Sequence, residues 1–280
     1  MLLNKRVENM SINGAREGIT NCVERIGSQT IAVVEEIGNG GFLFLESFFW
    51  LFAGPRLKQP VRFSAVVAQM MEIGVNAIPL IGMMAGTIGA MMAMQSIYML
   101  RIFGAESQVT YGVAYSVVRE FAPLITGILV AGRSGSALAA RLGTMKISQE
   151  IDALIVMGIN PVRFLVIPAL LAMLVMVPAL TIFNMMVGML CAGLYINADL
   201  GISMAAFSEQ VINILSVGDV MHGVGKSALF AVLITLIGVV NGASVKGGAE
   251  GVGKVTTRAV VQSISAIIVT DMIFAFMATR

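Results

Sequence analysis

Charge is scarce in this sequence. Only 12% of its 280 residues are Asp, Glu, Lys or Arg, about half the share in ordinary soluble domains, while 57% are hydrophobic. The mean hydropathy is +0.88. These values exclude an ordinary soluble domain and indicate an integral membrane protein. Because the apolar runs are about 20 residues or longer, they predict spanning helices and not the alternating strands of a membrane barrel.

Cysteine and histidine are almost absent. Cys22 and Cys191 are the two cysteines, and we expect them on opposite sides of the membrane, so no disulfide framework is predicted. His222 is the single histidine, which leaves no Cys/His cluster to hold a metal, and we expect it at the membrane interface. Lys5 and Arg6 are not followed by an apolar stretch, so we expect no cleavable signal peptide.

Complete motifs for nucleotide binding or nucleophilic catalysis are also lacking. GVGKS at 223–227 lacks the first glycine of a P-loop, and GGAEGVGKVTT at 247–257 has Val255 where a hydroxyl group should reach magnesium. GRSGS at 132–136 has Ser136 where a nucleophile elbow needs glycine. We therefore predict no catalytic residue, no metal site and no nucleotide site in this chain.

Five apolar segments are long enough to cross a bilayer. They are residues 73–100, 111–138, 162–196, 225–245 and 259–278. With the N-terminus inside, 14 of the 18 basic residues fall on one side, which the positive-inside rule assigns to the cytoplasm. This topology predicts a cytoplasmic N-terminus and a C-terminus on the opposite side of the membrane.

The segment 162–196 leaves two topologies open. Its 35 residues would rise about 52 Å as one straight helix, well beyond the hydrocarbon core, and Pro168 and Pro178 offer places to kink or divide it. Two passes would put Lys246, Lys254 and Arg258 outside. The charge pattern therefore favours one long helix.

The N-terminal part differs in character from the spans. Residues 12–37 have the pattern of an amphipathic surface helix, and residues 42–53 are strongly apolar but too short to cross, so we expect them to enter one leaflet only. We predict two domains: an interfacial helical arm over residues 1–60 and a transmembrane domain over residues 61–280. The fold class predicted is all-α.

A charged helix is predicted between the second and third spans. Ile147, Ile151, Leu154 and Ile155 recur at helical spacing, and polar residues occupy the other side. Gly158 and the Asn160–Pro161 pair should end this helix. It is either an ordinary interfacial helix or a coupling helix that docks on a cytoplasmic motor, and periodicity does not choose between them.

Ionisable residues also occur inside the spans. A charge in mid-bilayer costs roughly 2.5 to 3.5 kcal/mol, so Arg119, Glu120 and Asp271 need an explanation. Asp271 is a candidate partner for Arg119, because the two lie at similar depth. The group is either a structural ion pair or the polar wall of a cavity for an amphiphile with a charged head group. Gln95 and Tyr98 in the first span complete our candidate lipid-binding set.

Small residues repeat at four-residue spacing in the first two spans, which allows helices to approach closely within the chain or at a dimer interface. They are Gly82, Gly86 and Ala90, then Gly132, Ser136 and Ala140.

Two stretches resemble a known family. REFAPLITGILVAGRSGSALAARLGTMKISQEIDAL at 119–154, continuing into VMGINPVRFLVIP, is similar to the signature region of the MlaE family of bacterial ABC-transporter permeases. GGAEGVGKVTTRAVV at 247–261 resembles the family's second landmark. The likeness covers essentially residues 65–278.

The resemblance implies a homodimeric permease of the bacterial inner membrane. It would bind a cytoplasmic ATPase, which holds ATP and magnesium, and a periplasmic ring of MCE-domain subunits, expected to be a hexamer. The complex would move phospholipids between the inner and outer membranes and maintain outer-membrane lipid asymmetry. No nucleic acid is expected as a partner.

The resemblance also implies roles for particular residues. Arg119 and Glu120 match the family's polar pair at the lipid pocket. The ATPase-coupling residues would be Gln149, Glu150, Ile151, Asp152 and Leu154. The alternative from a different class is an ion-coupled carrier or channel that works alone, which Arg119, Glu120 and Asp271 leave open.

Overall fold

The structure is a computed structural model that describes residues 63–278 and, before them, residues 38, 40–43, 45–47 and 49–50. The chain divides into two compact units, residues 1–45 and 46–280, and the second is described here. The described residues form helices and loops and contain no strand, so the predicted all-α fold is confirmed. The predicted surface helix at 12–37 lies outside the described residues, and the two-domain division stays a prediction.

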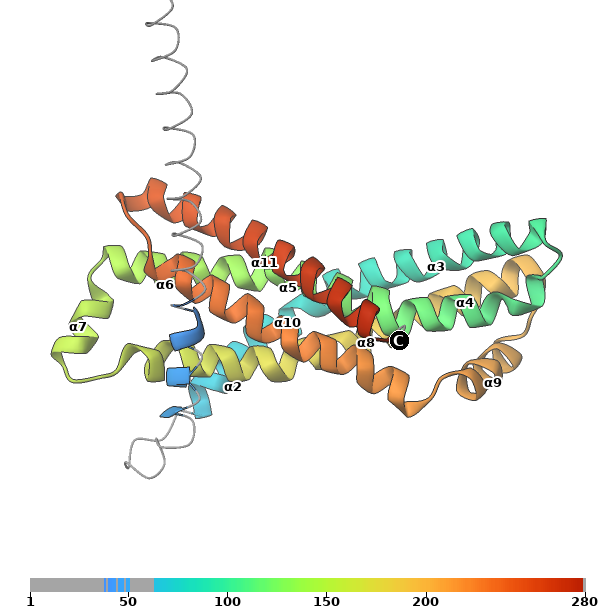
Figure 1. Cartoon of the computed structure of the whole chain (residues 1–280), viewed down its shortest axis with the longest axis horizontal. Coiled ribbons are helices and arrows are strands. Elements are labelled where there is room, and N and C mark those ends of the chain that lie inside the picture. Colours follow the sequence, from blue (N-terminus) through green and yellow to red (C-terminus); the bar gives the residue numbers. More distant parts are fainter. Residues whose placement is uncertain (1–37, 39, 44, 48, 51–62, 279–280) are drawn as a thin grey trace, which may run out of the picture. The chain divides into compact units, whose positions relative to one another are not determined.

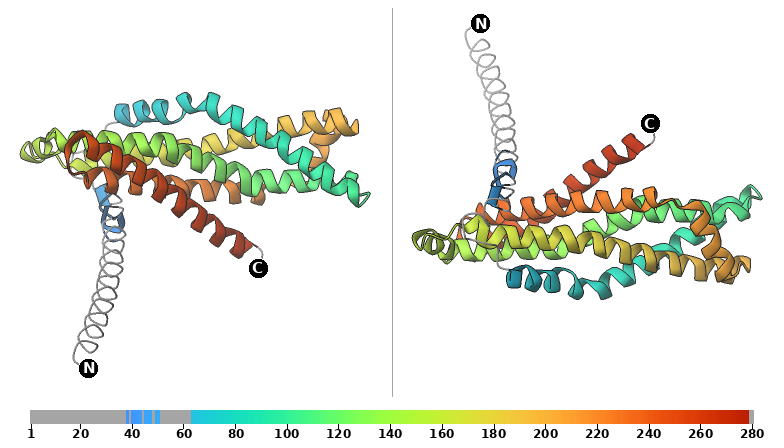
Figure 2. Two further views of the ribbon diagram at one scale, coloured as in Figure 1. Left: turned by 90° about the horizontal axis from the view of Figure 1, so that it is seen from above. Right: turned by 90° about the horizontal axis from the view of Figure 1, so that it is seen from below.

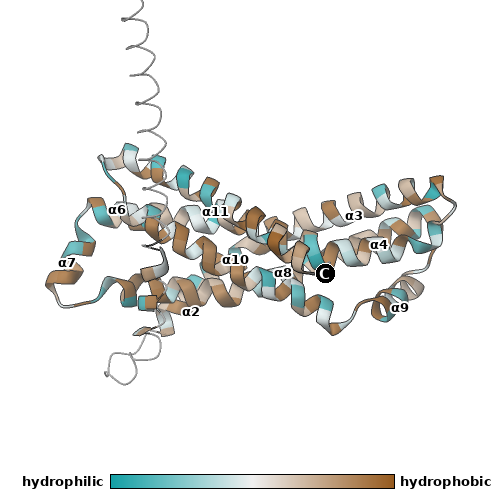
Figure 3. Cartoon of the chain, in the orientation of Figure 1, coloured by the Kyte–Doolittle hydropathy of each residue, from teal (hydrophilic) through white to brown (hydrophobic). Residues whose placement is uncertain are grey.

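Within the described residues, five helical segments are long and apolar enough to cross a membrane, as predicted. They are Phe63–Ile102, Glu106–Ile147, Val162–Leu200, Val217–Ala243 and Gly248–Met277. At 27 to 42 residues, all five are longer than a core of about 30 Å needs, so their ends extend past it. Figure 3 shows apolar residues along these helices and polar residues at α7 (Glu150–Val156) and the first turns of α11 (Gly248–Ala278).

The first two segments are built from several helical pieces. The first comprises α2 (Phe63–Ile73), the 3₁₀ turn η1 (Val75–Ala77) and α3 (Ile78–Ile102). The second begins with a 3₁₀ turn and alternates α- and π-helical pieces: η2 (Glu106–Gln108), α4 (Val109–Tyr115), η3 (Ser116–Phe121), α5 (Ala122–Val130), η4 (Ala131–Gly135) and α6 (Ser136–Ile147).

The third segment is one helix, which settles the alternative left open by its length. A π-helical turn, η5 (Val162–Val166), leads into α8 (Ile167–Leu200), which continues through Pro178. Gly201 ends α8 in the left-handed region at φ 70°. The predicted single long pass is therefore confirmed.

Tight packing of α3 on α8 forms much of the bundle. A Cβ atom on Gly89 would lie 2.1 Å from the carbonyl oxygen of Gly188, so the two backbones touch at this point. The predicted small-residue face of the first span packs on the same helix, with Gly86 against Cys191. In contrast, a Cβ on Gly132 in the second span would meet nothing within 4 Å.

The last two segments are α10 (Val217–Ala243) and α11. α10 packs against α6, α8 and α11, and its Phe230 and Ile234 are fully buried in the central apolar cluster. α11 contacts α10, α6 and α5, but its second half diverges from the other long helices in both views of Figure 2. As a result Val269, Met272 and Phe276 are exposed.

Two short helices lie at opposite ends of this bundle (Figure 1). α7 joins α6 to the third segment, and the amphipathic α9 (Met204–Ile214) joins α8 to α10. Phe207 of α9 is buried against the end of α8, where a Cβ on Gly193 would lie 2.7 Å from its ring. Thr110 donates a hydrogen bond to Gln210 Oε1 at 2.6 Å, which ties α9 to α4 as well.

Candidate functional site

A π-helical turn positions the first two charged residues of the site. Arg119 and Glu120 lie in η3, where i→i+5 hydrogen bonds widen the helix between α4 and α5. Both side chains engage partners on α10, two turns apart at Asp219 and Lys226. They do not pair with each other, as expected for neighbours on a helix.

Lys226 of α10 is the centre of the cluster. Its side chain is 0% exposed, and its Nζ lies 2.6 Å from Glu120 Oε2 and 2.7 Å from Asp271 Oδ1 of α11. Nζ also donates to the carbonyl oxygen of Arg119 at 3.2 Å. The contact to Glu120 is a charge-assisted hydrogen bond, whereas the contact to Asp271 is an ion pair whose angles fall outside hydrogen-bond geometry. Two carboxylates therefore compensate one buried ammonium.

Arg119 pairs with Asp219, and the predicted pairing of Arg119 with Asp271 is wrong. Arg119 Nη1 lies 3.6 Å from Asp219 Oδ1, and the guanidinium carbon lies 6.0 Å from the centre of the Tyr115 ring. The other oxygen of Asp219 accepts from Ser216 N and Oγ at 2.9 and 2.7 Å in a capping box. Asp271 instead pairs with Lys226 of α10, and α10 packs against both η3, which carries Arg119, and α11, which carries Asp271.

The cluster is open on one side. The side chains of Arg119 and Glu120 are 30% and 37% exposed, whereas those of Asp219 and Asp271 are 13% and 15% exposed. Next to them the ring of His222 packs edge-on against Phe274, with ring centres 5.8 Å apart. The accessible part of the cluster thus offers one positive and one negative group, which can engage a ligand that carries both signs.

Lys226 and Asp219 were missed from the sequence because the fourth span was expected to begin at residue 225. That boundary would place Lys226 at the interface, where a lysine needs no partner. In the structure α10 begins at Val217, so Lys226 lies about 13 Å along the helix from its first residue. The seven-residue spacing of Asp219 and Lys226, two helical turns, was the signal that the sequence offered.

Gln95 and Tyr98 lie elsewhere. Both are exposed on α3, with Tyr98 in an outward-facing series that includes Met94 and Met99. The cluster's ion pairs and hydrogen bonds come from η3, α10 and α11. Lipid contact by Gln95 and Tyr98 therefore stays a prediction that is separate from the charge cluster.

The predicted charged helix between the second and third spans is present as α7. Gln149 precedes it with φ 60°, and Glu150 and Asp152 lie in its first turn, where carboxylates favour the helix dipole. Gly158, at φ 73°, ends the helix. The N–H of Gly158 donates to Ile155 O and the N–H of Ile159 donates to Leu154 O, which together form a Schellman motif.

One side of α7 is anchored and the other is free to make contacts. Leu154 is buried, and Lys146 of α6 binds Asp152 at 3.0 Å. Ile155 and Met157 are exposed, and Val156 is 88% exposed. A short rigid helix with an apolar tip and acidic first turn, at the end of the bundle, is a surface suited to docking of another protein.

Comparison with known proteins agrees with this arrangement. The family model described as permease MlaE matches residues 66–277. A probable ABC transporter permease protein of Rickettsia typhi is 29% identical over 91% of this chain and 99% of its own length. The intermembrane phospholipid transport system permease protein MlaE of Haemophilus influenzae is 31% identical over 91% of this chain and 96% of its own.

A plant protein is also similar to this chain. Protein TRIGALACTOSYLDIACYLGLYCEROL 1, a chloroplastic protein of Arabidopsis thaliana, is 32% identical over 78% of this chain and 63% of its own length. The matched region contains all five spanning segments except the first turn of α2. This chain therefore belongs to the MlaE family of ABC-transporter permeases.

Proposed function

We propose that this chain is the permease subunit of an ABC transporter that moves phospholipids between the inner and outer membranes and thereby maintains outer-membrane lipid asymmetry. The observation that carries the proposal is the half-open charge cluster of Arg119, Glu120, Lys226 and Asp271 within a chain of this family. The name of the Haemophilus influenzae relative supports phospholipid as the substrate.

The cluster suits a lipid head group for an electrostatic reason. Arg119 is accessible, and its 3.6 Å ion pair with Asp219 is long enough for a phosphate oxygen to compete for the guanidinium. Glu120, also accessible, can attract an amine on the same head group. The fully buried Lys226 holds Glu120 in place, and it would not need to touch the lipid.

The exposed surfaces of a single copy support the proposed partners. The apolar side of α11 fits a second copy of this chain, which would close the cluster into a cavity between protomers. α7 would dock on a cytoplasmic ATPase that binds ATP and magnesium, and the end that carries α9 would face a periplasmic MCE-domain hexamer. The complex would lie in the bacterial inner membrane with the N-terminus cytoplasmic and the C-terminus periplasmic.

Replacing Arg119 tests the lipid site. We expect Arg119→Ala to lower the phospholipid that co-purifies with the complex by about tenfold, since a charge-assisted contact is lost, while assembly is retained. Arg119→Lys should keep most of the lipid because it keeps the charge. Mass spectrometry of the intact complex reports both lipid and subunits. Unchanged lipid in the alanine variant would contradict the site, and failure to assemble would assign Arg119 to packing.

Charge reversal on α7 tests the coupling assignment. Glu150→Lys with Asp152→Lys should weaken co-purification of the ATPase and lower its stimulation. Glu209→Lys on α9, at the other end of the bundle, is the control and should leave both unchanged. Normal association and stimulation in the double variant would refute the assignment. Transport in proteoliposomes that contain no ATPase would favour the alternative of an ion-coupled carrier.

A further inference from the structure

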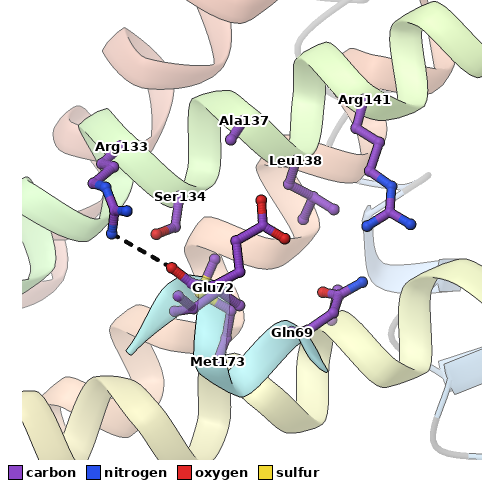
Figure 4. Close-up of a pocket in the computed structure, with 10 residues that line it drawn as sticks. Gln69, Glu72, Arg133, Ser134, Ala137, Leu138, Arg141 and Met173 are labelled. Atoms are coloured by element: carbon purple, nitrogen blue, oxygen red, sulfur yellow. Dashed lines mark hydrogen bonds between the residues drawn. The ribbon is translucent and has the colours of Figure 1, made fainter. Parts of the chain in front are cut away.

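A polar pocket lies between α2, α6 and α8, away from the charge cluster. Its volume is about 80 Å³, and Figure 4 shows the residues that line it. The base is apolar and consists of Ile73, Leu138, Ala169 and Met173. The rim is polar and consists of Gln69 and Glu72 from α2, Arg133 from η4, and Arg141 from α6.

The two arginines flank one small residue. Arg133, Ala137 and Arg141 follow each other at four-residue spacing, so they lie on one face of the helix. The methyl group of Ala137 leaves the space between the arginines open, and Ser134 and Leu138 line it from one side. In Figure 4 the carboxylate of Glu72 points into this same space.

These charged groups are weakly engaged by the protein itself. Arg133 Nη1 donates to the carbonyl oxygen of Glu72 at 3.5 Å, which is long for a hydrogen bond. Among the residues that the structure describes, neither the guanidinium of Arg141 nor the carboxylate of Glu72 has an ion-pair or hydrogen-bond partner. The pocket therefore presents two guanidinium groups and one carboxylate that are available to a ligand.

The position of the pocket along the membrane normal suggests the ligand. From Glu120 the helix rises about 20 Å to Arg133 and about 32 Å to Arg141, which is close to the thickness of the hydrocarbon core. The pocket and the charge cluster are thus separated by most of the thickness of the membrane. The pocket is on the side of α7, which the distribution of basic residues assigns to the cytoplasm.

We infer that this pocket binds the head group of a cytoplasmic-leaflet phospholipid, with the phosphate between Arg133 and Arg141 and a primary amine beside Glu72. Guanidinium pairs bind phosphate oxygens, and basic pockets between helices at the cytoplasmic face are suited to lipid head groups. The carboxylate favours a zwitterionic ligand over an anion alone.

Lipid titration of the purified full-length protein tests this inference, which does not depend on the proposed transport function. Phosphatidylethanolamine is added to delipidated protein in detergent, and bound lipids per protomer are counted by native mass spectrometry. We expect the double variant Arg133→Gln, Arg141→Gln to bind one lipid fewer per protomer, because its affinity for phosphatidylethanolamine at this pocket should fall at least tenfold. Lys246→Gln with Lys254→Gln, which replaces two exposed lysines outside the pocket, is the charge-matched control and should behave as wild type.

A second variant separates binding from folding. Ala137→Leu keeps every charge and fills the space between the arginines, and because Ala137 is exposed it should leave helix content and elution unchanged. It should nevertheless lower phosphatidylethanolamine binding. Glu72→Gln should raise binding of phosphatidylglycerol relative to phosphatidylethanolamine.

Two results would overturn the inference. One is wild-type lipid binding by a correctly folded Ala137→Leu variant or by the double glutamine variant. The other is binding of inorganic phosphate or free phosphoethanolamine as tight as that of the lipid, which would make this a site for a soluble phosphate. The Arg119→Ala variant, titrated in parallel, should still bind the lipid of this pocket. Failure of the proposed lipid site at the charge cluster can therefore be told apart from failure of this pocket.

Discussion

Lys226 is the residue on which the charge cluster depends. It is fully buried, and its ammonium is compensated by Glu120 and Asp271 from two other helical segments. Removal of one partner from a buried ion pair costs more than the pair contributes, because the remaining charges are left without compensation. The cluster can therefore hold η3, α10 and α11 in register while Arg119 stays available to a ligand.

Lys226→Met should accordingly destabilise the protein by about 3 kcal/mol, the lower end of the range for breaking a buried pair, because Glu120 keeps some access to water. The matched variant is Lys226→Met combined with Glu120→Gln and Asp271→Asn, which removes all three charges. Its melting temperature should recover most of the loss. Equal melting temperatures for wild type and Lys226→Met would show that the ion pairs do not support the fold.

Arg119, Glu120 and Asp271 could be identified from sequence because a charge inside an apolar segment is conspicuous. Their partners could not be assigned. Pairing depends on how η3 and α11 pack around α10, and the π-helical widening of η3 alters the direction of both side chains. Sequence spacing within one helix does not contain this information, which explains why Arg119 was paired with Asp271 and not with Asp219.

Among the helices, the contact between α3 and α8 sets the closest approach in the bundle. Gly89 and Gly188 let the two backbones touch, and a side chain at position 89 would collide with a carbonyl oxygen, not with a movable side chain. Helices in lipid associate through such packing, since apolar surface alone gives no preference over the surrounding acyl chains.

Gly89→Val should therefore separate α3 from α8 and cost about 1 to 3 kcal/mol or more, as overpacking does. The control is Gly112→Ala in α4, where a Cβ meets nothing within 4 Å and the change should be neutral or slightly stabilising. Thermal unfolding of the purified variants measures both. A Gly89→Val protein that melts with the wild type would contradict the contact.

Most elements could be predicted from hydropathy and capping signals. The five spans, the single helix at 162–200 and the end of α7 at Gly158 all follow from local composition. The π-helical turns and the division of the first span into α2, η1 and α3 could not, because they arise from packing between helices. The predicted spans are shorter than the helices, because the helices continue beyond the apolar stretches from which the spans are predicted.

For the whole molecule, the predicted orientation in the membrane places α7 inside and α9 outside. A variant without Cys22 and Cys191 can carry one new cysteine at Met157 or at Ile212, both exposed at opposite ends of the bundle. A membrane-impermeant thiol reagent applied to spheroplasts should label Ile212→Cys at once and Met157→Cys only after lysis. The reverse pattern would invert the topology and remove α7 from the cytoplasm.

The central claim is that energy from an ATPase, received at α7, changes the occupancy of a lipid site walled by Arg119 and Glu120. The most direct measurement is native mass spectrometry of the purified complex, with bound phospholipid counted before and after ATP is added. We predict that ATP lowers lipid occupancy in the wild type but not in the Glu150→Lys, Asp152→Lys variant. Lipid occupancy that is the same with and without ATP in the intact wild-type complex would contradict the account.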